Sequence, residues 1–198
     1  MTKTDVLTLA ILGTLAERPL HGYEIRKRLG LELGPFRALS YGSLYPCLKR
    51  MVADGLIEVS GEAADARKGR AGMDARRSRI AYALTQAGTD RLAEELAHSG
   101  ASSWDDDTFD VRFSMFAKTD SDTRLRILEG RRGRLAERLE EISQGLKAVR
   151  DRHDQYTAEL HRHGLERVER EVEWLDQLIE NERSAPRGSA NTASAGDN

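Results

Sequence analysis

Residues 40–50 carry hydroxyl groups and positive charges at a spacing that suits one helix. The hydroxyl side chains are Ser40, Tyr41, Ser43 and Tyr45. Lys49 and Arg50 follow on later turns. Hydroxyl groups and the amides of a helix N-terminus donate hydrogen bonds to phosphate, and the two cations add attraction. We therefore expect this segment to bind an anionic partner; the alternative is an ordinary core helix with a hydrated N-terminus.

A second cationic segment lies between residues 67 and 79. Its basic residues are Arg67, Lys68, Arg70, Arg76, Arg77 and Arg79, and Asp74 is its one acidic residue. The formal net charge of −2 hides the difference between the halves, because residues 1–96 hold 15 basic and 12 acidic residues and residues 97–198 hold 16 and 21. A locally basic first half suggests an anionic partner. A solvated loop is the alternative explanation.

Other kinds of chemistry have little support. His161 and His163 are two residues apart, so on a helix they point in different directions and do not form a metal pair. Cys47 is the single cysteine, which excludes an internal disulfide. Glycine-rich phosphate loops, metal clusters and nucleophile motifs are missing from the sequence. We expect no enzyme activity, no cofactor and no metal.

The apolar residues of the segment that follows Ser40 show how it is held. Leu44, Leu48, Met51 and Val52 recur at helical spacing, and Gly55 suits a left-handed C-terminal cap. Pro46 costs little if it falls in the first turn, so we predict a helix start at about residues 41–44.

The neighbouring elements follow from changes of period along the chain. We expect helices over residues 6–15, 20–29 and 86–97, the last one capped by Thr85, and strands over 56–59 and 80–84. Three helices, a strand, a basic loop, a strand and a helix are the order of a winged helix-turn-helix domain, in which the loop forms the wing. We assign this domain to residues 1–97.

The second half is mainly helical. Residues 98–108 form a linker, residues 109–116 a short aromatic helix, and a long helix runs from about residue 122 to 156, with a break at Gly164 before the last helix. Apolar heptads predict an antiparallel, coiled-coil-like region that dimerises across residues 109–183, with Arg132 as one exception. The expected dimer residues are Leu128, Leu135, Leu139, Ile142, Leu146, Val149, Val168, Val172, Leu175 and Ile179. Residues 184–198 have the composition of a disordered tail.

The N-terminal apolar run is too short to span a bilayer and lacks the features of a signal peptide. We therefore expect a cytoplasmic protein with no membrane partner.

Four segments of the first domain resemble the PadR family of transcriptional regulators. They are L-H-G-Y-E-I at 20–25, G-S-L-Y-P-C-L-K-R-M at 42–51, D-G-L-I at 54–57 and Y-A-L-T-Q-A-G at 82–88. The resemblance implies that residues 41–50 form a recognition helix, and that His21 and Lys27 lie on or near the supporting helix. The wing, residues 60–78, is longer than expected for the family, and Arg76, Arg77 and Arg79 are its expected DNA contacts.

Residues 113–139 and 163–179 resemble the α-helical C-terminal region of the longer PadR-like proteins, which forms the homodimer in that family. The resemblance implies a homodimeric repressor that binds an inverted-repeat operator in double-stranded DNA. Trp104 and Trp174 could line a site for a small aromatic or apolar effector, although plain interface packing explains them as well. The alternative function is a coiled-coil adaptor or small-molecule-binding protein whose winged helix contacts protein.

Overall fold

The computed structural model describes residues 3–33, 41–60, 80–150 and 155–185, and it divides the chain into two compact units, 1–120 and 121–198. Helices of the first unit are α1 (Lys3–Leu15), α2 (Gly22–Glu32), α3 (Tyr41–Ala53), α5 (Gln86–Ala97) and α6 (Phe109–Phe113). Its strands are β1 (Leu20–His21), β2 (Ile57–Ser60) and β3 (Ala81–Leu84), and 3₁₀ turns span Ala101–Ser103 and Phe116–Lys118. The second unit consists of α7 (Ser121–Arg150) and α8 (Gln155–Ser184).

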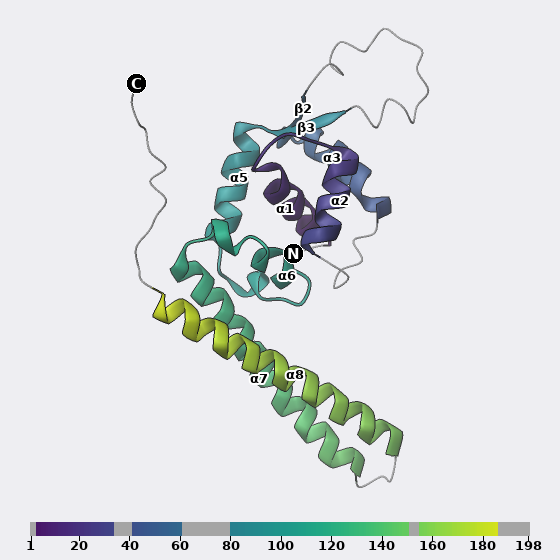
Figure 1. The fold of residues 1–198 in the computed structure, drawn as a ribbon. Coiled ribbons are helices and arrows are strands. Elements are labelled where there is room, and N and C mark those ends of the chain that lie inside the picture. Colours follow the sequence, from purple (N-terminus) through teal and green to yellow (C-terminus); the bar gives the residue numbers. More distant parts are fainter. Residues whose placement is uncertain (1–2, 34–40, 61–79, 151–154, 186–198) are drawn as a thin grey trace. The chain divides into compact units, whose positions relative to one another are not determined.

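Helix α1 forms the centre of the first unit, with α2, α3 and α5 around it (Figure 1). It is apolar on nearly all sides, and its buried apolar residues are Val6, Leu7, Leu9, Ala10, Ile11, Leu12 and Leu15. A helix that is hydrophobic all round must be covered on every face. The winged-helix body predicted from the sequence is therefore confirmed, and it is built around this helix.

The small sheet has three strands in the order β1-β3-β2, all antiparallel. Strand β2 pairs Ile57 with Leu84, and β1 pairs Leu20 with Tyr82. The prediction that residues 20 and 21 are helical was wrong. The backbone of His21 is extended, and its amide donates to the Glu24 carboxylate at 2.8 Å, so the helix starts only at Gly22.

Helix α3 ends as predicted. Gly55 has a φ of +71°, which favours glycine. The amide of Leu56 donates to the carbonyl of Met51 at 2.9 Å and the amide of Gly55 to that of Val52 at 3.2 Å. This pair of bonds is a Schellman motif, which satisfies the last carbonyls of the helix.

Pro46 lies deeper in α3 than predicted. The helix begins at Tyr41, so Pro46 is its sixth residue and lies beyond the first turn. A proline at this position leaves the carbonyl of Gly42 without its intrahelical donor. Gly42 is exposed, so water can hydrogen-bond to this carbonyl.

Helix α5 starts at a close contact with the end of α3. Thr85 caps it as predicted, accepting a hydrogen bond from the Gly88 amide at 3.1 Å. The Thr85 hydroxyl lies 2.6 Å from the carbonyl of Gly55. A Cβ at Gly88 would lie 2.0 Å from the carbonyl oxygen of Leu56, so only glycine fits there. The T-x-x-G sequence thus fixes α5 against the turn that follows α3.

The first unit continues to Asp120, which differs from the predicted domain end at residue 97. Val111 and Met115 belong to the same hydrophobic core as α1. The side chain of Arg112 is only 2% exposed; it donates to the backbone carbonyls of Glu95 and His98 and, at 2.9 Å, to the Glu95 carboxylate. Burial lowers the pKa of Arg112. Arg112 thereby caps the C-terminus of α5 and holds the segment after the predicted linker against it.

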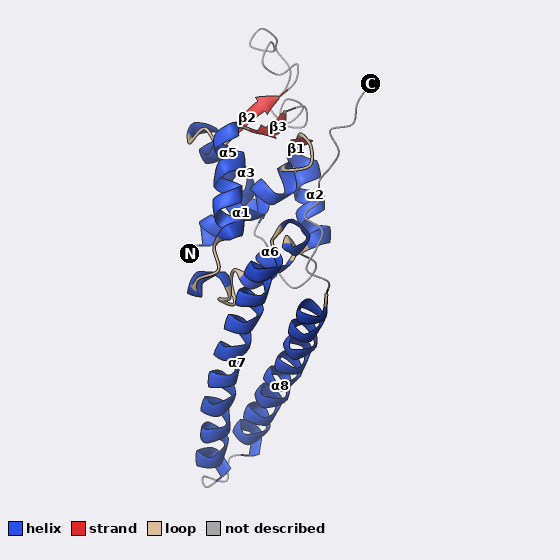
Figure 2. Cartoon of the chain, turned by 90° about the vertical axis from the view of Figure 1, so that its left-hand side faces the viewer, coloured by secondary structure: helices blue, strands red, loops and turns tan. Residues whose placement is uncertain are grey.

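In the second unit, α7 and α8 run antiparallel side by side (Figure 2). Leu128, Leu135, Leu175 and Ile179 are buried within the single chain. Interhelical ion pairs of the described residues flank them, among them Arg124–Glu182, Glu129–Arg183, Arg131–Glu171 and Arg132–Asp176. Arg132, the exception in the predicted heptads, therefore has a partner on the facing helix.

The break predicted at Gly164 was wrong, because α8 begins at Gln155 and continues through Gly164. A glycine inside a helix costs only about 1 kcal/mol, which the packing of a 30-residue helix can offset.

We predict that Arg112→Met lowers the free energy of unfolding of the first unit by about 3–5 kcal/mol, because it leaves buried polar groups without their donor. Arg91→Met is the matched control: Arg91 also pairs with Glu95, but its side chain is 52% exposed, so the loss should not exceed about 1 kcal/mol. Guanidinium unfolding followed by circular dichroism measures both. Equal losses in the two variants would contradict the capping role of Arg112.

Candidate nucleic-acid interface

Helix α3 has one buried and one exposed face. Leu44, Cys47, Leu48 and Met51 are buried in the core. The exposed residues are Gly42, Ser43, Tyr45, Pro46, Lys49 and Arg50. The predicted two-sided helix is confirmed, and its hydroxyl and cationic side chains lie on the face away from the core.

One side of the Tyr45 ring packs on the protein, and the other side faces solvent. It is partly exposed, yet its ring covers the start of α2: a Cβ added at Gly22 would lie 3.1 Å from Tyr45 Cε1. Burial, and to a lesser extent the nearby Tyr45, raises the pKa of Tyr82 on β3. Tyr45 therefore helps to hold α3 against α2 and β3 while part of it stays open to solvent.

The two cations of α3 are held differently. Arg50 donates to the Thr8 hydroxyl at 3.0 Å and lies 4.0 Å from the Asp54 carboxylate and 3.6 Å from the Cys47 sulfur. Lys49 is exposed and makes no ion pair or hydrogen bond with the residues that the structure describes. Lys49 can thus reach an external anion, whereas Arg50 is already bound to the body of its own domain.

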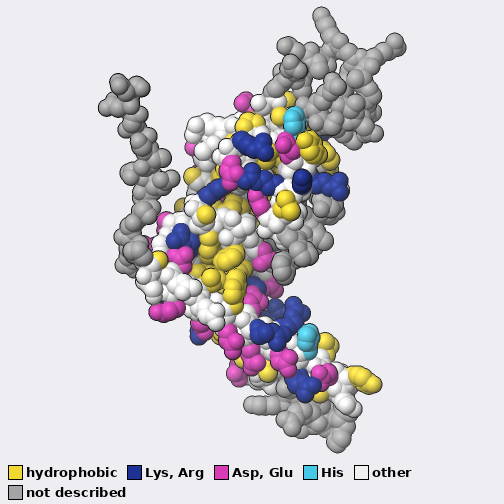
Figure 3. All heavy atoms as spheres, viewed as in Figure 1, with side chains coloured by type: hydrophobic (Ala, Val, Ile, Leu, Met, Phe, Trp, Pro, Cys, Tyr) yellow, Lys and Arg dark blue, Asp and Glu magenta, His cyan; other side chains and the backbone are white. Residues whose placement is uncertain are grey.

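Helix α2 presents a second polar surface. The His21 ring is half-buried and stacks on Tyr23 with ring centroids 6.0 Å apart. Tyr23 is 55% exposed, and Lys27 is exposed one turn further on. Figure 3 shows basic side chains gathered on the face of the first unit that carries α2, with acidic side chains among them. The predicted residues His21 and Lys27 therefore both lie on or near an accessible helix.

Some predicted contacts lie outside the described residues. These are Ser40, Arg76, Arg77 and Arg79, together with the side chain of Tyr41, whose backbone begins α3. Their role as DNA contacts stays a prediction.

The predicted dimer residues pack mainly inside the single chain. Leu128, Leu135, Val168, Leu175 and Ile179 are buried, and Leu139, Ile142 and Val172 are half-buried. The side chains of Leu146 and Val149 are outside the described residues. A dimer interface at these positions stays a prediction. Any partner would have to reach residues that the antiparallel pair of α7 and α8, the helical hairpin, already covers.

A more exposed apolar stripe on α8 was missed in the sequence. Tyr156 is 90% exposed, Leu160 70% and Trp174 39%. Tyr156 and Leu160 are one turn apart, and Trp174 lies five helical turns after Tyr156, so all three share one side of α8. The spacing could have been found in the sequence, but the expected break at Gly164 hid it.

The two tryptophans belong to different units: Trp104 is half-buried in the first unit, and Trp174 is exposed in the second. An effector site that uses them stays a prediction. Among the described residues, no cluster of three or more histidine, cysteine or acidic side chains could hold a metal ion. No helix in the described ranges has the length and hydropathy needed to cross a membrane.

Comparison with known proteins gives one family. Residues 11–94 match the model of the transcriptional regulator PadR-like family. No curated protein matches the chain.

Several solved structures resemble the chain at low identity. PadR from Bacillus subtilis in complex with operator DNA is 21% identical, with a TM-score of 0.40, and the match covers 89% of this chain and 99% of that one. The complex of the same protein with p-coumaric acid is also 21% identical, with a TM-score of 0.40 and coverage of 90% and 99%. A PadR-like transcriptional regulator from Bacillus cereus is 16% identical, with a TM-score of 0.35 and coverage of 89% and 98%.

The matched residues 11–94 contain α2, α3, the sheet and most of α5, which together carry the exposed polar face described above. The winged-helix domain therefore matches the PadR-like family of transcriptional regulators over residues 11–94.

Proposed function

We propose that the protein is a sequence-specific DNA-binding repressor that acts as a homodimer and responds to a small-molecule effector. The observation that carries this proposal is the two-sided helix α3 in a domain of a regulator family. A recognition helix must be anchored by apolar residues on one side and offer donors and cations on the other.

In the proposed docking, α3 enters the major groove with its N-terminal half foremost. Ser43 and the exposed part of Tyr45 meet base edges or phosphates, together with Ser40 and Tyr41. Lys49 contacts phosphate on a later turn. Arg50 acts through the domain itself, because its hydrogen bond to Thr8 holds α3 on α1.

Further contacts come from α2 and the wing. Lys27, with His21 nearby, would contact the DNA backbone beside the groove. Arg76, Arg77 and Arg79 on the wing would contact a minor groove or flanking phosphates.

The homodimer is proposed to use the exposed stripe of α8. A stripe made of Tyr156, Leu160 and Trp174 is an unusual surface for a helix that is otherwise highly charged. A two-fold related copy would cover it, and the same two-fold axis would relate two recognition helices and two half-sites of DNA. An inverted repeat with half-sites about 34 Å apart, or a multiple of this, is the expected operator.

We expect Lys49→Ala to weaken binding to all DNA sequences and to reduce the slope of log affinity against log salt by about one unit, because one phosphate contact is lost. Arg50→Ala should change affinity with little change in this slope. Titrations of the DNA upstream of the protein's own gene, at several salt concentrations, measure both. Arg162→Ala removes an exposed charge from α8, away from the proposed interface, and serves as the control.

Two outcomes would count against this docking. An unchanged salt slope for Lys49→Ala would exclude Lys49 as a phosphate contact. A protein that dimerises but binds no site in its upstream DNA would favour the adaptor function instead.

We expect Leu160→Glu to convert the dimer into a monomer, because it buries a charge in the proposed interface. Leu160 is exposed in the single chain, so the helical content should stay unchanged, whereas Leu135→Glu would disrupt the hairpin itself. Sedimentation equilibrium with circular dichroism tests this. Glu169→Lys, on the opposite side of α8, is the matched control and should leave the dimer intact. If the Leu160→Glu variant still formed a dimer, the interface would have to lie elsewhere.

A further inference from the structure

The first residue of α2, Gly22, is buried, and the ring of Tyr45 from α3 lies directly against it. A Cβ at Gly22 would lie 3.1 Å from Tyr45 Cε1, 3.6 Å from its hydroxyl oxygen and 3.7 Å from Cζ. The first of these distances is shorter than a normal contact between carbon atoms, which is about 3.5–4.0 Å. The backbone of Gly22 does not itself require glycine, because its φ lies outside the left-handed region. The missing Cβ therefore matters for the Tyr45 ring.

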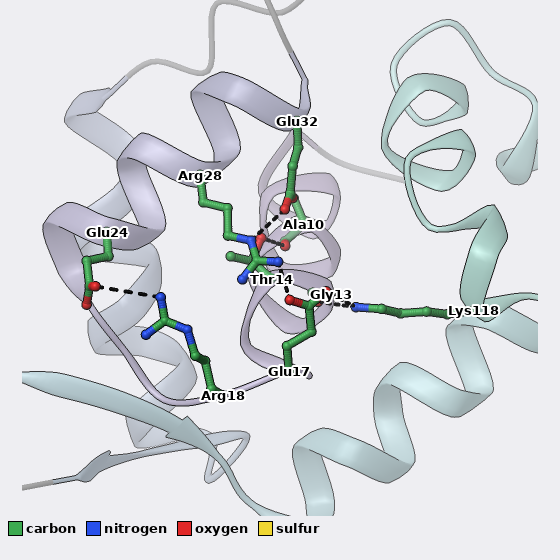
Figure 4. Close-up of polar contacts among 9 residues, drawn as sticks. All are labelled: Ala10, Gly13, Thr14, Glu17, Arg18, Glu24, Arg28, Glu32 and Lys118. Atoms are coloured by element: carbon green, nitrogen blue, oxygen red, sulfur yellow. Dashed lines mark hydrogen bonds and ion pairs between the residues drawn. The ribbon is translucent and has the colours of Figure 1, made fainter. Parts of the chain in front are cut away.

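Helix α2 is fixed on its other sides, so it does not move aside for an added Cβ. The Glu24 carboxylate accepts from the His21 amide at 2.8 Å and lies 3.9 Å from the Arg18 guanidinium (Figure 4). One turn later, Arg28 donates to Glu17, which follows α1. The start and the middle of α2 are thus both tied to the chain around α1.

The Tyr45 ring can yield in one direction. Towards β3 it has Tyr82 as a neighbour, whose pKa is raised by burial and, to a lesser extent, by Tyr45. Leu44 and Leu48, on the buried face of α3, anchor the helix in the core. The remaining side of Tyr45, which is 39% exposed, faces solvent. A Cβ at Gly22 would therefore push the ring outward, which in the proposed docking is toward the DNA.

We propose that Gly22 is a positioning residue for DNA recognition, which sets how far Tyr45 projects from α3 toward a base edge in the major groove. The inference rests on the proposed function, in which Tyr45 meets base edges or phosphates. It assigns Tyr45 to a base edge and adds a buried residue that acts only through the Tyr45 ring.

The two kinds of DNA contact differ in how they respond to a small displacement. An added Cβ requires the ring to move by a few tenths of an ångström. Hydrogen bonds to base edges depend steeply on distance and angle, so this movement weakens them. The attraction of Lys49 to phosphate falls off slowly with distance and hardly changes. The loss should therefore appear in the specificity of binding, whereas the affinity for DNA of any sequence is kept.

The test measures the affinity of the full-length protein for two DNA fragments of equal length, the region upstream of its own gene and an unrelated sequence. The ratio of the two affinities is the specificity. Gly22→Ala should lower this ratio about tenfold, because binding to the upstream fragment weakens. Its affinity for the unrelated fragment and the slope of log affinity against log salt should stay unchanged, since no phosphate contact is lost.

Gly133→Ala is the matched control. Gly133 is an exposed glycine inside α7, and no atom of the described residues comes within 4 Å of a Cβ built there. This variant makes the same chemical change in a helix without displacing a side chain. It should alter neither affinity, and far-UV circular dichroism checks that all variants are folded.

A double-mutant cycle connects the effect to the Tyr45 ring. Tyr45→Ala should lower the specificity by itself, and adding Gly22→Ala to it should cause no further loss, because no ring is left to displace. An equal loss from Gly22→Ala with and without the ring would overturn the proposal, since the helix start would then be distorted as a whole. An unchanged specificity in Tyr45→Ala would overturn it as well, whatever the stability of Gly22→Ala.

The wild-type protein separates this inference from the proposed function. Tighter binding of the upstream fragment by the wild type, with an unchanged ratio in Gly22→Ala, overturns the positioning role alone. Equal binding of the two fragments by the wild type overturns the sequence-specific regulator, and with it the role of Gly22.

Discussion

The burial of α1 on every side is the constraint on which the first unit depends. Each Leu or Ile side chain that it buries contributes about 1.5–3 kcal/mol, so no face of the helix can be left in water. Helices α2, α3, α5 and α6 must therefore all pack on it. Because α3 is fixed to α1 through Leu44, Leu48 and Met51, the direction of its other face is fixed as well. The polar face that meets DNA in the proposed docking is thus a consequence of how the core is filled.

Features set by neighbours in the sequence could be predicted. The Gly55 cap, the Thr85 cap and the two faces of α3 each depend on residues within a few positions of one another. Strand β1 and the capping of α5 by Arg112 could not be predicted, because both need partners far along the chain. Leu20 pairs with Tyr82, and Arg112 bonds Glu95 and His98. Periodicity carries no information about which distant carbonyl an arginine will reach.

The arginines explain why the candidate site was predicted only in part. Counted by charge, Arg50 is as good a DNA contact as Lys49, but its guanidinium already bonds Thr8, 42 residues away. Arg131 and Arg132 likewise join α7 to α8 through Glu171 and Asp176. Arginine suits such contacts because its planar group donates several hydrogen bonds in fixed directions, whereas lysine is a mobile point charge. In this chain a basic residue is therefore a stronger candidate for an external anion when it is a lysine without a partner.

The hairpin of the second unit sets a similar limit on assembly. Heptads in the sequence identify residues that pack between helices, but they do not say whether the facing helix belongs to the same chain. Here α7 and α8 use Leu128, Leu135, Leu175 and Ile179 on each other, and the ion pairs beside them fix the antiparallel register. Once these residues are buried, they cannot also form the surface that a second copy meets first. A partner must begin with what the hairpin leaves exposed, and on α8 the large apolar side chains left exposed are Tyr156, Leu160 and Trp174.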